Sequence, residues 1–174
     1  AYAPLFSFLN EQEKDCVVFV RETTPEMSEL NTLIPAFTHC NRYATTELFG
    51  LIPDERWLQN YLALLRLRGV SSGEVETYLQ SHEREAVGYL YSNWQGLFGV
   101  NDFPDFSDPV LIERLAAFPE EYRRFMTKDF GEELKRYRID FILSDGPLSP
   151  SFLTEFRGRA LLRVLDGRHL YHFD

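Results

Sequence analysis

The sequence lacks the signatures from which a reaction is usually inferred. The turn that follows its first apolar run, Arg21 to Pro25, has no glycine and carries an acidic side chain, so its backbone amides could not closely approach a pyrophosphate. No apolar run approaches the ~20 residues that a membrane span needs, and no signal-peptide pattern is present. No asparagine stands in an Asn-X-Ser/Thr sequon, so the sequence offers no mark of N-glycosylation. These absences exclude a dinucleotide site after the first apolar run and a membrane-spanning segment within the given sequence.

Positive charge is also scarce. The formal net charge is -9 and the sequence pI is about 5.0. The clustered arginines and lysines lie on helical patterns rich in Glu and Asp, as on a solvated helix face. An acidic chain without a basic stripe repels phosphate backbones. We therefore expect no nucleic-acid partner.

Soft metal ligands are few, with two cysteines and four histidines in the whole chain. Their spacing matches no metal-binding pattern, and we expect no metal or other cofactor. Cys16 and Cys40 would form a disulfide if the strands that they precede are neighbours; otherwise they are two separate thiols.

What is present indicates an α/β fold. The central element of the chain is Ile139 to Leu143, an apolar run that ends before Asp145-Gly146 and is typical of a buried parallel strand. The runs from Cys16 to Val20 and from Ala160 to Leu165 can pair with it, and Asn41 to Thr46 is a weaker strand. Asp166-Gly167 between two apolar runs predicts a terminal β-hairpin.

Helical patterns fill the rest of the chain. Thr24 and Pro25 begin one helix, which Pro35 ends or kinks. Between the strands lie the helical patterns listed here: Glu55 to Arg68 with Gly69 as its stop, one after the capping box Ser71–Glu74, Arg84 to Leu97, one capped by Asp108, a further one that restarts at Pro119, and Phe130 to Arg138. We predict a single α/β domain over residues 1–174, with a mostly parallel Rossmann-like sheet, a large helical insertion at about 53–138 and a C-terminal β-hairpin.

Two polar segments are candidate ligand-binding sites. Thr38, His39, Asn41 and Arg42 surround the start of the second strand; an ordinary helix-to-strand loop is the alternative. Asp145 lies at the carboxyl end of the central strand, where ligands bind in open α/β sheets; a plain Asp-Gly turn is the simpler alternative. The carboxylates of Asp102, Asp105 and Asp108 could hold calcium, but their spacing matches no known loop. We assign no catalytic residue.

Four stretches together resemble a known family. They are a helix, polar turn and Val-Val-Phe strand at Phe8–Phe19; its continuation at Leu33–Thr38 and Asn41–Ala44; a helix and Tyr-x-Ile-Asp-Phe-Ile-Leu core strand at Glu133–Leu143; and a closing hairpin at Leu161–Tyr171. This series resembles the soluble C-terminal domain that follows the membrane spans in polytopic bacterial and archaeal proteins similar to GT-C-type glycosyltransferases. The resemblance covers about half of the chain, and the insertion after Pro53 has no counterpart.

The resemblance implies a membrane-embedded parent protein with its spans upstream of Ala1. The absence of an initial Met agrees with a processed piece of a longer chain. The domain would lie on the extracytoplasmic side, against the membrane-spanning portion of its own chain, and would support assembly or the binding of an acceptor, a glycan or a lipid-linked sugar. The catalytic carboxylates of such enzymes lie in the membrane portion, so none is carried over onto this chain.

Two other functions are compatible with the sequence. The first is a free-standing carbohydrate- or ligand-binding α/β module, in which its nine Tyr, two Trp and the aromatic loop from Asn101 to Ser107 would stack on sugar rings; the alternative is that these residues belong to the core. The second is a small soluble hydrolase or transferase that uses Asp145 and His39.

Overall fold

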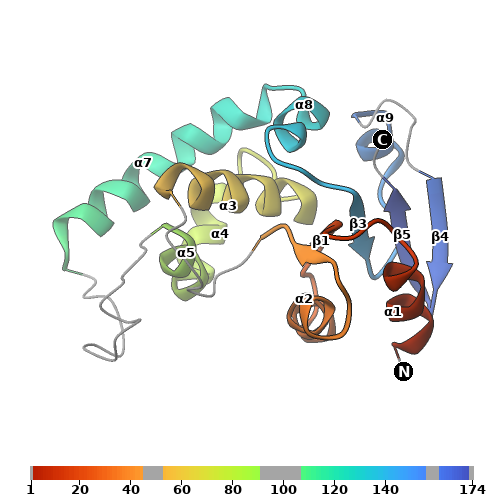
Figure 1. Cartoon of the computed structure of the whole chain (residues 1–174). Coiled ribbons are helices and arrows are strands. Elements are labelled where there is room, and N and C mark those ends of the chain that lie inside the picture. The colour runs from red at the N-terminus through yellow and green to blue at the C-terminus, as the bar shows by residue number, and fades with distance from the viewer. Residues whose placement is uncertain (1, 45–52, 91–106, 156–160, 173–174) are drawn as a thin grey trace. The chain divides into compact units, whose positions relative to one another are not determined.

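A computed structural model describes residues 2–44, 53–90, 107–155 and 161–172 of the chain (Figure 1). The chain divides into two compact units. The sheet unit comprises Ala1–Ala44 and Asp129–Asp174, and the helical unit comprises Thr45–Lys128. All strands among the described residues belong to the sheet unit.

The sheet unit contains a five-stranded sheet in the order β2-β1-β3-β5-β4. Its strands are β1 (Val17–Val20), β2 (Asn41–Arg42), β3 (Phe141–Ser144), β4 (Leu161–Leu165) and β5 (Arg168–His172). β1 pairs in parallel with β2 and β3, whereas β5 pairs antiparallel with β3 and β4. This confirms a mixed α/β fold with parallel core strands and an antiparallel C-terminal hairpin. The second strand is shorter than predicted, and residues 45 and 46 lie outside the described residues.

The predicted hairpin turn is confirmed in its backbone geometry. Asp166 has a φ of 52° and Gly167 a φ of 76°. A two-residue turn with positive φ at both positions matches the right-handed twist of the flanking strands. Asp and Gly tolerate this region better than other residues do, which explains why this dipeptide was informative.

Four described helices belong to the sheet unit: α1 (Ala3–Asn10), α2 (Pro25–Phe37), α8 (Phe130–Lys135) and α9 (Pro150–Glu155). Thr24 caps α2, as predicted, because its side chain accepts a hydrogen bond from the Met27 amide. Pro35 does not end this helix, since α2 continues to Phe37; of the two predicted effects, the end is wrong and the kink stays a prediction. A proline in the last turn removes only one helical hydrogen bond, and the Thr38 amide still donates to the Ile34 carbonyl.

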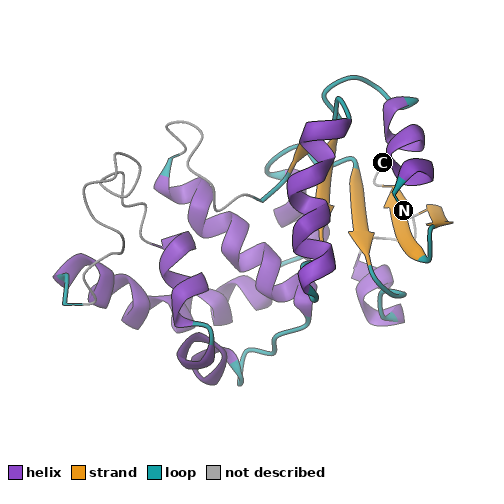
Figure 2. Ribbon diagram, turned by 90° about the horizontal axis from the view of Figure 1, so that it is seen from below, coloured by secondary structure: helices purple, strands orange, loops and turns teal. Residues whose placement is uncertain are grey.

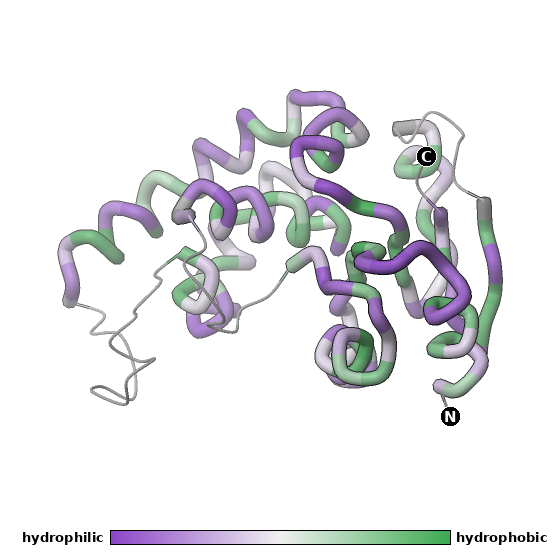
Figure 3. The backbone as a smooth tube through the Cα atoms, viewed as in Figure 1, coloured by the Kyte–Doolittle hydropathy of each residue, from purple (hydrophilic) through white to green (hydrophobic). Residues whose placement is uncertain are grey.

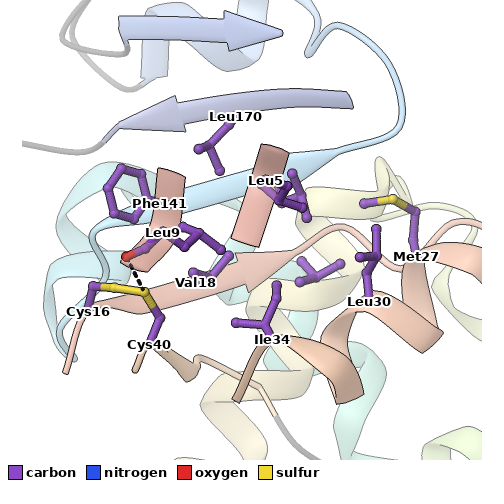
Figure 4. Close-up of a cluster of buried hydrophobic side chains, with 12 residues drawn as sticks. Leu5, Leu9, Cys16, Val18, Met27, Leu30, Ile34, Cys40, Phe141 and Leu170 are labelled. Atoms are coloured by element: carbon purple, nitrogen blue, oxygen red, sulfur yellow. Dashed lines mark hydrogen bonds between the residues drawn. A yellow bond between two sulfur atoms is a disulfide. The ribbon is translucent and has the colours of Figure 1, made fainter. Parts of the chain in front are cut away.

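One face of the sheet is covered by α1 and α2 (Figure 4). The buried cluster draws on positions spaced by three or four residues along the helices and by two along the strands. Its helical members are Leu5, Leu9, Met27, Leu30 and Ile34, and its strand members are Val18, Val20, Phe141, Leu143 and Leu170. The two periodicities therefore meet in one core, which fixes the sheet against these helices.

The helical unit contains α3 (Asp54–Arg68), α4 (Val75–Ser81), α5 (Glu83–Leu90) and α7 (Pro109–Met126) among its described residues (Figure 2). Gly69 ends α3 with a φ of 86°, as its position in the sequence predicted. The predicted helix from Arg84 is described only to Leu90. Its remainder, including Trp94 and Leu97, lies outside the described residues, as do Asp102 and Asp105 of the calcium alternative.

The predicted helix break at Pro119 is wrong, because α7 runs through this residue as one helix of 18 residues. Apolar and polar residues alternate along α7 (Figure 3). Phe118 and Tyr122 are fully buried beside the proline, and Phe118 lies 5.0 Å from the Tyr61 ring between centroids. Packing on both sides of Pro119 thus offsets the ~3 kcal/mol by which proline disfavours a helix interior.

None of the described helices combines sufficient length with sufficient apolarity to cross a bilayer.

Candidate functional site

The structure separates the predicted site residues onto two edges of the sheet. Thr38 and His39 precede β2, whereas Asp145 follows β3, and both strands run parallel to β1. The register pairs Val17 with Asn41 and Val18 with Phe141, so Asn41 lies level with Asp140. Asp145 is five residues further along, about 16 Å at the usual rise of a strand. The structure therefore does not bring His39 and Asp145 together, and the hydrolase or transferase alternative that uses them stays a prediction without support from this geometry.

At the amino edge, most polar groups close the loop between α2 and β2. Thr38 Oγ1 donates to the Ile34 carbonyl at 2.7 Å and accepts from the Cys40 amide at 3.1 Å. The His39 amide donates to Asn10 Oδ1 at 3.1 Å. Asn41 is exposed and Arg42 is half-buried. This arrangement agrees with the ordinary-loop interpretation of these residues, and their binding of a ligand stays a prediction.

The same edge holds a disulfide between Cys16 and Cys40. The sequence predicted this disulfide only if the strands after the two cysteines are neighbours. β1 and β2 are neighbours, and each cysteine directly precedes its strand. Both cysteines are 1% exposed. The bond closes the β1–α2–β2 segment over a sequence separation of 24.

The carboxyl edge of β1 and β3 is a topological switch point. From β1 the chain passes through α2 to β2 on one side, and β3 pairs with β1 on the other side. Ligands of open α/β sheets bind in the crevice at such a point. Thr23 follows β1 and donates its hydroxyl to Asp145 Oδ2 at 2.8 Å. Both residues are exposed, so the predicted residue Asp145 has a partner that the sequence did not indicate.

Next to this pair, the carboxylate of Glu22 is held by α2. It accepts hydrogen bonds from Ser28 Oγ at 3.0 Å and from Asn31 Nδ2 at 2.7 Å. Asn31, which is buried, also donates to the Ala44 carbonyl at 3.2 Å. Hydrogen bonds from α2 side chains therefore connect the segment after β1 with the segment after β2 at this edge.

Ser144 and His169 extend the edge along the sheet. They are directly opposite each other in the antiparallel pairing of β3 with β5, so their side chains lie on the same face. Ser144 is fully buried, and its hydroxyl accepts from the Gly146 amide at 3.4 Å. His169 Nδ1 is shielded from solvent and has no hydrogen-bond partner in the part of the chain that the structure describes. The sequence did not indicate this pair. The Asp166-Gly167 turn predicts how β4 aligns with β5, but nothing in the sequence predicts how β5 aligns with β3.

Charged side chains of both signs lie at the carboxyl edge. Arg21 and Glu22 directly follow β1 and Asp145 follows β3, while Glu26 stands in the first turn of α2. Arg168 forms an ion pair with Glu26. Partial burial, followed by the carboxylates of Glu29 and Glu26, raises the pKa of the Tyr2 phenol. The carboxylate and hydroxyl oxygens at this edge can accept hydrogen bonds from the hydroxyl groups of a neutral ligand.

A cavity of about 420 Å³ lies elsewhere, in the helical unit. Its lining is mainly apolar with four charged residues, and consists of Glu55, Leu58, Tyr89, Leu90, Val110, Glu113, Arg114, Ala117 and Glu121. The guanidinium of Arg114 is engaged by the Leu90 carbonyl at 2.7 Å. None of the predicted site residues lines this cavity.

The chain was also compared with known proteins. No protein-family model matches it, and neither a curated protein nor a solved structure matches it.

Proposed function

We propose that the chain is a non-catalytic extracytoplasmic domain of a membrane glycosyltransferase-like protein, in which it supports the binding of an acceptor, a glycan or a lipid-linked sugar. Within this proposal the sheet is Rossmann-like, and the helical segment is an insertion in a single domain. The resemblance of the four sequence stretches supports the family. The membrane anchor would be supplied by another part of the parent chain.

The observation that carries the binding function is the pair of Thr23 and Asp145 at the switch point between β1 and β3. The pair offers hydroxyl and carboxylate oxygens on the exposed surface. Neutral sugars present many hydroxyl groups that can donate to such oxygens, and the net charge of -9 on the whole chain disfavours phosphate groups. Asp145 accepts a hydrogen bond from Thr23 in the free protein, which holds its carboxylate in place before a ligand arrives.

The extracytoplasmic location is supported by the disulfide. Bonds such as Cys16–Cys40 form and persist in oxidising compartments and are rare in the cytosol. We expect both cysteines to resist alkylation when the protein is trapped in intact cells, and to become reactive after denaturation with a reductant. Alkylation of denatured but unreduced protein would contradict the extracytoplasmic assignment.

A glycan array tests the binding function directly. We expect saturable binding of the oxidised wild-type chain, a loss of at least tenfold in affinity for Asp145→Ala, and a similar loss for Thr23→Ala. Lys14→Ala is the matched control, because Lys14 is exposed in the turn before β1, at the opposite edge of the same sheet. Binding that is equal in the Asp145 and Lys14 variants, or an array without any bound glycan, would reject the proposed site.

The free-standing binding module remains the second candidate and uses the same edge. The two candidates differ only in whether the domain is part of a membrane-embedded parent chain. Fractionation of cells separates the two, because the glycosyltransferase-like parent must sediment with membranes through spans of ~20 apolar residues, whereas a free-standing module must not.

A further inference from the structure

Three metal-ligating groups gather at the amino edge, although their spacing in the sequence predicted no metal site. Cys16, His39 and Cys40 each offer a ligand atom, and these atoms all lie within 4.8 Å of one another. Cys16 comes from the segment before β1, and His39 and Cys40 come from the segment before β2. The parallel pairing of these strands brings the three side chains together, which the separation in sequence concealed.

We propose that this cluster is a redox-controlled zinc site, closed as the Cys16–Cys40 disulfide and able to bind Zn²⁺ through both thiolates and His39 when the disulfide is reduced. Two cysteines and one histidine form a known ligand set for zinc, with a fourth position left to water. The inference is independent of the proposed glycan function, which concerns the other edge of the sheet.

The hydrogen bond of His39 prepares the imidazole for a metal. His39 Nε2 lies 3.1 Å from the carbonyl oxygen of Glu13. A carbonyl only accepts, so Nε2 carries the hydrogen and Nδ1 keeps its lone pair in the neutral ring. Metal-bound histidines commonly donate their second N–H to a backbone carbonyl, which fixes the orientation of the ring. Nδ1 is therefore the nitrogen that we assign as the ligand.

The backbone around the cluster is held by hydrogen bonds that do not involve the sulfur atoms. The Asn41 amide donates to the Cys16 carbonyl at 2.6 Å, and the His39 amide is held by Asn10. Cys40 Sγ lies 3.6 Å from the Leu9 carbonyl oxygen (Figure 4). These hydrogen bonds do not depend on the disulfide, so they remain available to position the ligands after reduction.

Charge and exposure also favour zinc over an empty dithiol. Two thiolates and a neutral imidazole exactly balance the charge of Zn²⁺, so the complex adds no net charge to a buried position. Both cysteines are 1% exposed, whereas His39 is half-buried. The ion and its water can therefore reach the sulfurs from the side of His39.

The chemistry has two steps, each of which is balanced. A phosphine reductant and water convert the disulfide into two thiols and one phosphine oxide; in a cell, a dithiol would be oxidised to its own disulfide instead. Zn²⁺ then displaces one proton from each thiol, so that two protons are released to solvent as the zinc complex forms.

Native mass spectrometry of the full chain tests the site with zinc itself. After reduction with a phosphine, we expect one Zn²⁺ per wild-type chain, and none in the oxidised protein. His39→Ala should bind zinc at least tenfold more weakly, and the double variant Cys16→Ser/Cys40→Ser should bind none. His82→Ala is the control, because His82 is exposed in the helical unit and its loss should change nothing.

Cobalt substitution gives a readout that a purely structural role would not move. Reduced wild-type protein with Co²⁺ should show a thiolate-to-cobalt charge-transfer band, which the double cysteine variant must lack. If reduction unfolds the sheet unit, added zinc should restore its circular dichroism in the wild type and not in the double variant. Reduced wild-type protein that neither binds nor is restored by zinc, or His39→Ala with undiminished affinity, would overturn the site. Glycan binding by oxidised protein would be unaffected by that outcome.

Discussion

Two buried tyrosines of the helical unit differ in whether the hydroxyl group has a hydrogen-bond partner. The Tyr122 hydroxyl donates to the Val70 carbonyl at 2.6 Å, whereas the Tyr61 hydroxyl has no partner among the described residues. Removing a satisfied buried hydroxyl loses about 0.5–1.5 kcal/mol, while removing an unsatisfied one relieves a desolvation penalty. We expect Tyr122→Phe to lower the free energy of unfolding by about 1 kcal/mol, and Tyr61→Phe to leave it unchanged or raise it. Urea unfolding measures both, and equal losses would contradict the assignment.

A buried ion pair in the same unit gives a larger effect. Arg68 Nη1 contacts both carboxylate oxygens of Glu85, at 2.8 and 2.7 Å, and also the Tyr78 hydroxyl. The Arg68 side chain is 10% exposed and that of Glu85 is 27% exposed. Glu85→Leu leaves the guanidinium buried without its carboxylate, and we expect a loss of about 3 kcal/mol, at the lower end for buried pairs.

The double variant Arg68→Met/Glu85→Leu separates the ion pair from mere packing. It removes both charges, so it should be more stable than Glu85→Leu alone. Glu76→Leu is the surface control, because its pair with Arg123 is exposed on both sides and should contribute little. A double variant less stable than the single one would show that the charge left on Arg68 is not what destabilises Glu85→Leu.

At the scale of elements, the cap of α2 can be tested against a threonine further along the same helix. Thr24 Oγ1 accepts from the Met27 amide at 3.3 Å, whereas the Thr32 hydroxyl donates to the Ser28 carbonyl at 3.5 Å within the exposed helix surface. We expect Thr24→Ala to lower stability by about 1 kcal/mol. Thr32→Ala should be neutral or slightly stabilising, since Ala is the better helix former. Thermal unfolding at neutral pH compares the pair, and a larger loss for Thr32→Ala would contradict the capping assignment.

The sequence predicted those elements whose signals are local. Gly69, Thr24 and the Asp166-Gly167 turn each act through the φ value or the hydrogen bond of one or two residues, and each was found where expected. The helix ends predicted at Pro35 and Pro119 were wrong. A proline destabilises the helix only at its own turn, whereas α2 and α7 are stabilised by packing against residues distant in the sequence. A residue's own preference is visible in the sequence, whereas the contacts that override it are not.

The candidate sites follow the same division. The place of Asp145 at the end of β3 was predictable because the end of a buried strand is recognisable from the apolar run before it. Its partner Thr23 and the pair of Ser144 and His169 depend on the strand order, which single-sequence patterns do not fix. The grouping of His39 with Asp145 failed for that reason, because parallel strands place the start of β2 and the end of β3 at opposite edges.

For the whole molecule, the two units respond to different chemistry. Burial, followed by the nearby Glu85 carboxylate, raises the pKa of Tyr61, and burial raises the pKa values of Tyr78 and Tyr122, all in the helical unit. An acid with a raised folded-state pKa stabilises the fold below its ordinary pKa, near 10 for tyrosine. This contribution is lost as the pH rises above that value, because the unfolded chain then releases protons that the folded chain retains. The disulfide lies in the sheet unit instead.

Hydrogen exchange measured by mass spectrometry should therefore show two separable losses of protection. Reduction of Cys16–Cys40 removes the restraint on a loop with a sequence separation of 24, worth about 3 kcal/mol, and we expect faster exchange in β1, α2 and β3 with little change in α3 and α7. Raising the pH above about 10 should instead speed exchange in α3 and α7 and leave β1, α2 and β3 little changed, after correction for the intrinsic rate of exchange. The double variant Cys16→Ser/Cys40→Ser must reproduce the first pattern without a reductant, and Tyr122→Phe must weaken the second. If either treatment exposed both units to the same extent, the chain would unfold as one cooperative body, and the disulfide and the buried phenols would stabilise the whole molecule rather than the unit that contains them.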